Sequence, residues 1–144
     1  MSTQEVNKNQ SALAEVVISI VHASPSPELL ALIQLSGQEG KRPENITQMN
    51  LSHKGIITLP SDIGLCLNLE HLHLGNNQLT SLPAEIGNLQ KLRVIYLRGN
   101  QLTFLPAEIA NLKNLTHLHL GNNQFTREQI LEIKSWIPNC IIVY

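Results

Sequence analysis

The chain has few aromatic residues and little charge of either sign. Aromatic side chains make up 3% of its 144 residues and charged side chains 15%, and 10 lysines and arginines nearly balance 11 acidic residues. A chain so close to neutral lacks the basic surface that binds nucleic acids or anionic membranes. No apolar run approaches the ~20 residues that a transmembrane helix needs. We therefore expect neither nucleic acid nor a membrane as a partner.

Cysteine is equally scarce, and the motifs of common catalytic sites are missing. Cys66 and Cys140 lie far apart and belong to no metal-ligand or redox motif, which favours a reduced, cytoplasmic location. Secretion as an effector stays open as an alternative. The chain has no GxxxxGK[ST] phosphate loop, and no serine–histidine–aspartate pattern is tied to a cleft. We accordingly expect no enzyme activity and no cofactor.

What the chain does have is a pattern that repeats every 23 residues. The pattern reads LEHLHLGNNQLTSLPAEIGNLQK from Leu69, LRVIYLRGNQLTFLPAEIANLKN from Leu92 and LTHLHLGNNQF from Leu115. A fixed period of this length predicts a solenoid, in which no repeat can bury its apolar face alone and each packs on its neighbours. Counting back one period adds a first repeat from Ile46, in which Lys54 replaces the asparagine of the other repeats.

The repeats divide the chain into four parts. We expect a disordered tail at residues 1–10, an N-terminal helical cap at 11–45, repeats at 46–125 and a C-terminal cap at 126–144. The single repeats are expected at 46–68, 69–91, 92–114 and 115–125.

The N-terminal cap is expected to contain two helices. An apolar stripe with helical spacing predicts an amphipathic helix over Ser11–Ala23, and the alternative for this stretch is a cleaved signal peptide. Ser26 as N-cap and Pro27 at the first helical position predict a second helix over Pro27–Ser36. Gly37 is a typical residue to follow its end. This helix should cover the open end of the first repeat, whose core would otherwise be exposed.

The C-terminal cap is expected to contain a helix and a strand. Thr126 and Gln129 form a capping box that starts the helix, and Pro138 ends it. Cys140–Tyr144 then predicts a final short strand. Continuing the period would place Cys140 beside His117, but this strand is apolar on both sides and the direction of the cysteine stays open.

Apolar and polar residues alternate at the start of each repeat, which predicts one short strand there. The inward residues of these strands are expected to be Met49, Leu51, Leu72, Leu74, Ile95, Leu97, Leu118 and Leu120. Asn77, Asn100 and Asn123 stand where the chain turns away from the strand. A short amide can donate to and accept from buried backbone groups there, so a structural role is favoured over a binding role.

The pattern LxxLxLxxNxLxxLPxxIGxLxx, which covers Ile46–Phe125, resembles the 23-residue leucine-rich repeat of Ras-group scaffold proteins and many bacterial proteins. The ending WIPNCIIVY resembles the C-terminal closure of bacterial members, and LSHKGIITLP is similar to the first repeat of bacterial Roco-type proteins. The resemblance implies an α/β fold: a right-handed leucine-rich-repeat solenoid, shaped as a short horseshoe with a parallel concave sheet. It also implies that the concave sheet binds a protein partner and that the chain is not a catalyst.

The alternation assigns an outward face to the expected sheet. The residues expected on or beside this face are Gln48, Asn50, His53, Glu70, His71, His73, Arg93, Tyr96, Arg98, His117 and His119. Five of the six histidines gather there. Because aromatic and arginine side chains dominate protein-binding hot spots, Tyr96 and Arg98 are the expected anchors of a partner in signalling or host interaction.

Three alternatives to this interpretation stay open. The face can be solvated polar surface that was duplicated with the repeat. It can be a metal site, although His71 and His73 lie roughly 6.6 Å apart on one strand, and zinc–nitrogen bonds of about 2.0–2.1 Å require closer convergence. The chain can also be an accessory to a GTPase or ubiquitin ligase whose catalytic domain is on another chain. We expect no bound metal.

The expected face is small. Four or five strands offer about 300–400 Å², whereas a standard interface uses about 800 Å² on each partner. The chain should therefore bind weakly, use residues around the sheet as well, or form a weak homo-oligomer.

Overall fold

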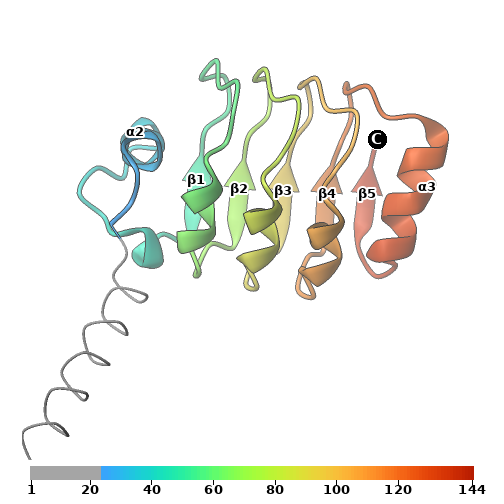
Figure 1. Ribbon diagram of the computed structural model, residues 1–144. Coiled ribbons are helices and arrows are strands. Elements are labelled where there is room, and N and C mark those ends of the chain that lie inside the picture. The colour runs from blue at the N-terminus through green and yellow to red at the C-terminus, as the bar shows by residue number, and fades with distance from the viewer. Residues whose placement is uncertain (1–23) are drawn as a thin grey trace, which may run out of the picture.

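The structure is a computed structural model that describes residues 24–144, and its centre is one sheet of five parallel strands (Figure 1). The strands lie side by side in sequence order and are β1 (Gln48–Asn50), β2 (His71–His73), β3 (Val94–Tyr96), β4 (His117–His119) and β5 (Ile141–Val143). From β1 to β4 the paired residues are one repeat apart, so the 23-residue period of the sequence sets the register of these strands. The tail and first helix expected within residues 1–23 fall outside the described residues.

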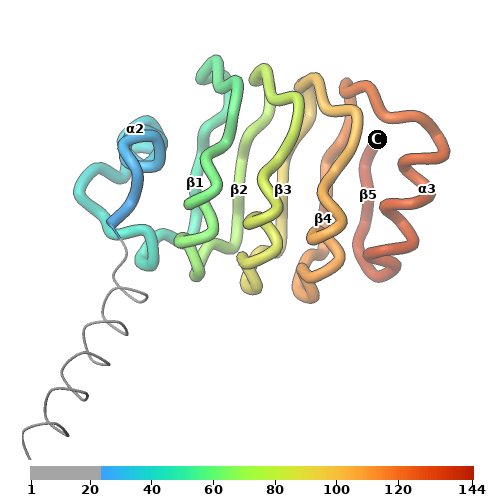
Figure 2. Tube along the Cα trace, viewed as in Figure 1, coloured from blue at the N-terminus to red at the C-terminus, as the bar shows by residue number. Residues whose placement is uncertain are grey.

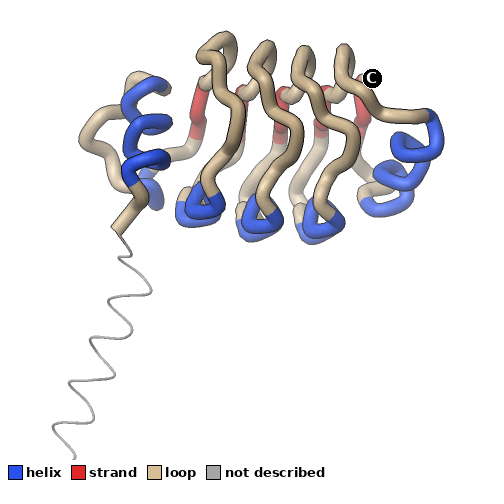
Figure 3. The backbone as a smooth tube through the Cα atoms, turned by 45° about the horizontal axis from the view of Figure 1, so that its top comes forward, coloured by secondary structure: helices blue, strands red, loops and turns tan. Residues whose placement is uncertain are grey.

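Each of the first three repeats returns on the other side of the core through a short 3-10 helix (Figures 2 and 3). These helices are η2 (Ser61–Leu65), η3 (Ala84–Asn88) and η4 (Ala107–Asn111). Each follows a proline in extended conformation, because the LP dipeptide of the repeat cannot continue the preceding hydrogen bonds. The sheet surface turned away from these helices is called the concave face below.

Leucine and isoleucine side chains from both sides fill the space between the sheet and the 3-10 helices. The eight inward strand residues predicted from the alternation are all buried, so that prediction is confirmed. From the return segment of the second repeat, Leu79, Ile86 and Leu89 are fully buried in the same core. The core is therefore continuous along the solenoid, and each repeat covers the apolar side chains of its neighbour.

The predicted asparagines satisfy the backbone of the buried turns. The side-chain oxygen of Asn77 accepts from the N–H groups of Lys54 and Ile56 at 3.0 Å each, and its Nδ2 donates to the carbonyls of Leu51 and Leu74 at 2.9 Å each. Asn100 and Asn123 also bridge their own turn to the preceding one. The structural role is thus confirmed. The first repeat has no preceding turn to bridge, and an exposed lysine can stand there.

Gly87 lets neighbouring repeats approach closely on the side of the 3-10 helices. A methyl group at this buried position would lie 2.7 Å from both the Cβ and the carbonyl oxygen of Glu108 in η4. At Gly64, one repeat earlier, the nearest atom would be the Cβ of Glu85 at 3.1 Å. The corresponding residue of the last repeat is Ala110, beyond which helix α3 follows in place of another 3-10 helix.

Helix α2 (Pro27–Leu35) covers the β1 end of the core. It begins as predicted, with the Ser26 hydroxyl accepting from the N–H of Leu29 at 3.1 Å, and ends one residue before the predicted Ser36. Its side chains Leu29, Leu32 and Ile33 are buried in the common core. The segment that leads to β1 contains the short 3-10 helix η1 (Pro43–Asn45).

Helix α3 (Arg127–Trp136) covers the opposite end, beside β5 (Figure 1). The predicted capping box is present, because Thr126 and Gln129 exchange hydrogen bonds between side chain and backbone. Ile130 and Ile133 on this helix are buried. Within residues 24–144, no helix combines the length and the apolar character needed to cross a bilayer.

Candidate functional site

The side chains of the concave face form two parallel rows that cross the strands. The first row is Gln48, His71, Val94, His117 and Ile141, and the second row is Asn50, His73, Tyr96, His119 and Val143. Both rows begin with a polar amide on β1 and end with an aliphatic side chain on β5; the three residues between are all rings in the second row, whereas Val94 separates two histidines in the first. The face is therefore graded, with its most apolar part at the C-terminal end.

Three rings of the second row are stacked on one another. The ring centroids of His73 and Tyr96 lie 4.5 Å apart with planes 20° from parallel, and those of Tyr96 and His119 lie 4.4 Å apart at 22°. Parallel strands bring these rings to the spacing at which aromatic faces attract. We call His73, Tyr96 and His119 the aromatic ladder. Because the tyrosine is covered on both faces, the ladder presents ring edges to a ligand.

Burial and a neighbouring histidine disfavour protonation of the two histidines in the ladder. Burial lowers the pKa of His73, and the neighbouring His71 lowers it further. The pKa of His119 is lowered by burial and then by His117 in the same way. The two imidazoles should therefore be neutral near pH 7 and present a weakly polar surface.

This depression of the two pKa values predicts a loss of stability in mild acid. The unfolded chain binds protons on these histidines near pH 6.5, whereas the folded chain binds them only at lower pH. Their contribution to stability is therefore complete above about pH 6.5 and is lost as the pH falls through the folded values. Urea unfolding should show a lower midpoint at pH 5.5 than at pH 7.5. The variant with His73→Gln and His119→Gln should show a smaller difference, and an equal difference would contradict the prediction.

The predicted charged residues lie just before or just after the strands that carry the two rows. Glu70 and Arg93 come one residue before β2 and β3, at the edge where the strands begin. Arg98 follows β3 by two residues, and its aliphatic stem passes over Gly121, where a methyl group would be 3.8 Å from Arg98 Cγ. The structure thus brings Arg98 next to the ladder but keeps Glu70 and Arg93 at the edge.

His53 is separate from the four strand histidines. It lies in the turn after β1 with a left-handed backbone, φ 58°, as do Asn76 and Asn122 at the same position of later repeats. The Nδ2 group of Asn76 donates to His53 Nε2 at 3.2 Å. The side chain therefore belongs to the row of turns, while the four strand histidines share the concave face.

The neighbour of His117 on β5, which the sequence left open, is not the residue that would continue the 23-residue period. Ile141, not Cys140, pairs with His117, because helix α3 replaces the return half of the repeat and lengthens the spacing to 24 residues (117 to 141). Cys140 is half-buried against the core. Ile141 and Val143 take the concave positions instead and are 58% and 46% exposed. These two aliphatic residues are the part of the site that the sequence did not reveal.

The histidines do not converge as metal ligands do. In the part of the chain that the structure describes, no three His, Cys, Asp or Glu side chains form a group that could hold a metal ion. Tyr96 stands between His73 and His119, and the stacked geometry keeps their ring nitrogens apart.

The sheet, its repeat and its asparagine turns can be compared with known proteins. A family model described as a leucine-rich repeat region matches residues 48–136, which include β1 to β4 and helix α3. The chain belongs to the leucine-rich repeat family. The resemblance stated from the sequence motif is thereby confirmed.

Solved structures of bacterial leucine-rich repeat proteins are similar to this chain. A leucine-rich repeat protein of Leptospira interrogans is 42% identical over 69% of the chain, with a TM-score of 0.69. An internalin and internalin C2 of Listeria monocytogenes are 22% and 21% identical over 88% of the chain, with TM-scores of 0.68 and 0.52, and support the fold alone. The chain spans 26% of the Leptospira protein and 37% and 66% of the two internalins. No similar protein was found among curated sequences.

Membership of the leucine-rich repeat family gives the chain a general role. Leucine-rich repeat proteins are in general protein-interaction modules without a catalytic centre. The short solenoid and its open concave sheet agree with that role.

Proposed function

We propose that this leucine-rich repeat chain binds a protein partner through its concave face, with the aromatic ladder at the centre of the contact. The observation that carries the proposal is a stripe of four side chains across the sheet. It consists of the stacked rings of His73, Tyr96 and His119 and, beside His119, the exposed Val143. Covering this stripe removes apolar and aromatic surface from water, which is the main driving force of protein association. The chain has six histidines, and four of them stand on this face together with Tyr96, a concentration that favours binding over a merely solvated surface.

Polar groups around the stripe would orient the partner. Gln48 and Asn50 are exposed on β1, and Arg98 is exposed beyond β3. An apolar centre with a polar surround is the usual arrangement of a protein interface. The amides and the guanidinium can supply hydrogen bonds at two sides of the stripe.

We also propose that the concave face is not catalytic. Thr116 and His117 form a hydroxyl–imidazole contact of 3.0 Å, but the Thr116 hydroxyl donates to the carbonyl of Arg93. The imidazole therefore has no hydroxyl proton to accept there, as a general base would need. The surrounding sheet is also open, so water is not excluded.

We further propose a cytoplasmic setting, in signalling or in host interaction. The support is the state of the two thiols: Cys66 and Cys140 are free, and Cys66 is buried. Burial raises the pKa of the Cys66 thiol to about 12 and that of Cys140 to about 11. Neither thiol forms the reactive thiolate near neutral pH, and neither supplies a structural disulfide. Cell fractionation tests this setting, which a wholly secreted chain would contradict.

Replacing both anchors, Tyr96→Ala with Arg98→Ala, should weaken partner binding at least tenfold, because buried aromatic and arginine residues dominate interface energies. The partner is first captured with the wild-type chain, and its affinity for each variant is then measured by titration calorimetry. Phe104→Ser is the matched control. Phe104 is 53% exposed outside the sheet, and the preceding repeat has Ser81 at that position. Equal losses in both variants, or none in the double variant, would reject the concave face as the binding site.

A further inference from the structure

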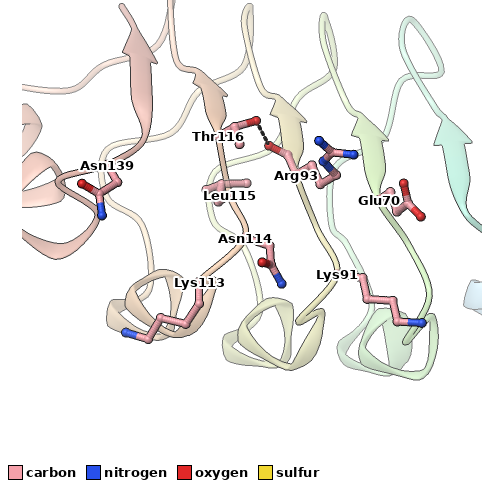
Figure 4. Close-up of a pocket in the computed structure, with 8 residues that line it drawn as sticks. All are labelled: Glu70, Lys91, Arg93, Lys113, Asn114, Leu115, Thr116 and Asn139. Atoms are coloured by element: carbon pink, nitrogen blue, oxygen red, sulfur yellow. Dashed lines mark hydrogen bonds between the residues drawn. The ribbon is translucent and has the colours of Figure 1, made fainter.

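A hollow lies at the edge of the sheet where the strands begin. It measures about 520 Å³ and is built by the segments that lead into β2, β3, β4 and β5 (Figure 4). Its polar side chains include Glu70, Lys91, Arg93, Lys113, Asn114 and Asn139. The aromatic ladder is not part of this hollow.

Positive charge in the hollow exceeds negative charge. Lys91, Arg93 and Lys113 line it together with one carboxylate, Glu70. Within residues 24–144, no carboxylate lies within 4.0 Å of these three cations, since the single ion pair found there joins Arg42 and Glu44.

The two lysines of the hollow bond neutral oxygens instead. Lys91 Nζ donates to Asn68 Oδ1 at 2.7 Å, and Lys113 Nζ donates to the carbonyl of Ala110 at 3.1 Å. Both ammonium groups retain further donors. The hollow can therefore neutralise acidic groups of a ligand with charge-assisted hydrogen bonds.

An apolar pocket of about 210 Å³ lies next to this hollow. Lys113, Leu115 and Asn139 line both cavities, so the two are adjacent. Leu112, Trp136 and Pro138 line the apolar part, next to Cys140. A ligand that fits both parts carries acidic groups beside an apolar group.

We infer that this edge binds an acidic peptide segment, with its carboxylates at Lys91, Arg93 and Lys113 and a neighbouring apolar side chain in the pocket beside Trp136. The inference rests on the proposed function only in taking the ligand to be part of a protein partner. A nucleic acid fits less well, because Glu70 in the hollow repels a polyanion and the whole chain carries a net charge of −1. The edge would add contact area to a concave face that is small for an interface.

The experiment uses the full chain and a displayed library of random 12-residue peptides. Peptides enriched on the wild-type chain are sequenced, synthesised and titrated, with the fluorescence of Trp136 as the readout. Trp136 is the single tryptophan of the chain and lines the apolar pocket, so its emission reports occupation of that pocket. We expect enriched peptides to carry acidic residues next to an apolar residue and to change this emission.

Variants in which the charge of the lysines is reversed show whether the peptides bind in the hollow. Lys91→Glu with Lys113→Glu should weaken the enriched peptides at least tenfold. The control pair Lys54→Glu with Arg127→Glu changes the net charge equally at exposed positions outside the hollow and should have little effect. Tyr96→Ala should leave these peptides bound, which separates this test from that of the concave face.

Three results would overturn the inference. The first is a library that enriches no acidic peptides. The second is binding that is lost with Tyr96→Ala but not with the lysine reversals, which would leave the proposed function standing. The third is a 12-nucleotide oligothymidylate that binds as tightly as the peptides and displaces them, because the edge would then attract any polyanion.

Discussion

Replacing Gly87 with alanine is expected to destabilise the protein by about 3 kcal/mol, near the upper end of the range for overpacked cores. The added methyl group would lie 2.7 Å from both the Cβ and the carbonyl oxygen of Glu108. These atoms belong to the start of η4, whose position is fixed by the buried Ile109. No side-chain rotation can relieve the contact, so two neighbouring repeats would have to separate.

A graded series of glycine substitutions isolates this packing effect. Gly64→Ala meets Glu85 at 3.1 Å and should cost less, while Gly75→Ala meets its nearest atom, the carbonyl oxygen of Arg98, at an ordinary 3.5 Å. Gly64, Gly75 and Gly87 all lack a positive φ, so backbone strain does not differ among them. Thermal melts should rank the three variants in this order, with Gly87→Ala lower than wild type by about 10 °C. A loss at Gly75 as large as at Gly87 would contradict the packing argument.

Asn100→Ala is expected to destabilise the protein by a similar amount, about 3 kcal/mol, because it leaves several buried backbone groups without partners. The Asn100 side chain accepts from the N–H of Leu79 at 3.0 Å and donates to the carbonyls of Leu74 and Leu97 at 2.9 and 3.0 Å. Asn100 is only 7% exposed, so water cannot easily replace the lost side-chain hydrogen bonds. Urea unfolding measures the loss.

Two further variants separate hydrogen bonding from packing at this turn. Asn100→Asp keeps the shape but places a carboxylate oxygen against the two carbonyls, and should be as destabilising as alanine at pH 7. Lys54→Ala is the control at the same position of the first repeat, where the side chain is exposed. If Asn100→Asp is as stable as wild type, the amide donors are not what holds the turn.

The sequence was most informative where the chain repeats itself. The core leucines and the turn asparagines could be predicted because each occurs at one position of a period, and the period fixes which backbone positions face inward. The two end helices could be predicted from local chemistry, since Ser26, Thr126 and Gln129 act within one turn of their own helix. The candidate face followed from the same alternation, and β1 to β4 place its strand residues as expected.

Features that depend on several segments could not be predicted. The length of α3 sets the register of β5, so Ile141 and Val143 could not be assigned to the concave face from the period. Ring stacking depends on side-chain torsions, which strand positions do not fix. The basic hollow combines Lys91 and Lys113. These lysines occupy different positions of the repeat, so they do not recur with the 23-residue period.

The short separation in sequence between paired strands affects how the chain folds. Parallel sheets are ordinarily slow to form, because their strands are distant in sequence and a long loop must close before any contact is gained. Here every strand pairs with one only 23 or 24 residues away, and each asparagine bridges adjacent turns alone. Folding can therefore begin at any neighbouring pair of repeats and extend one repeat at a time towards both ends.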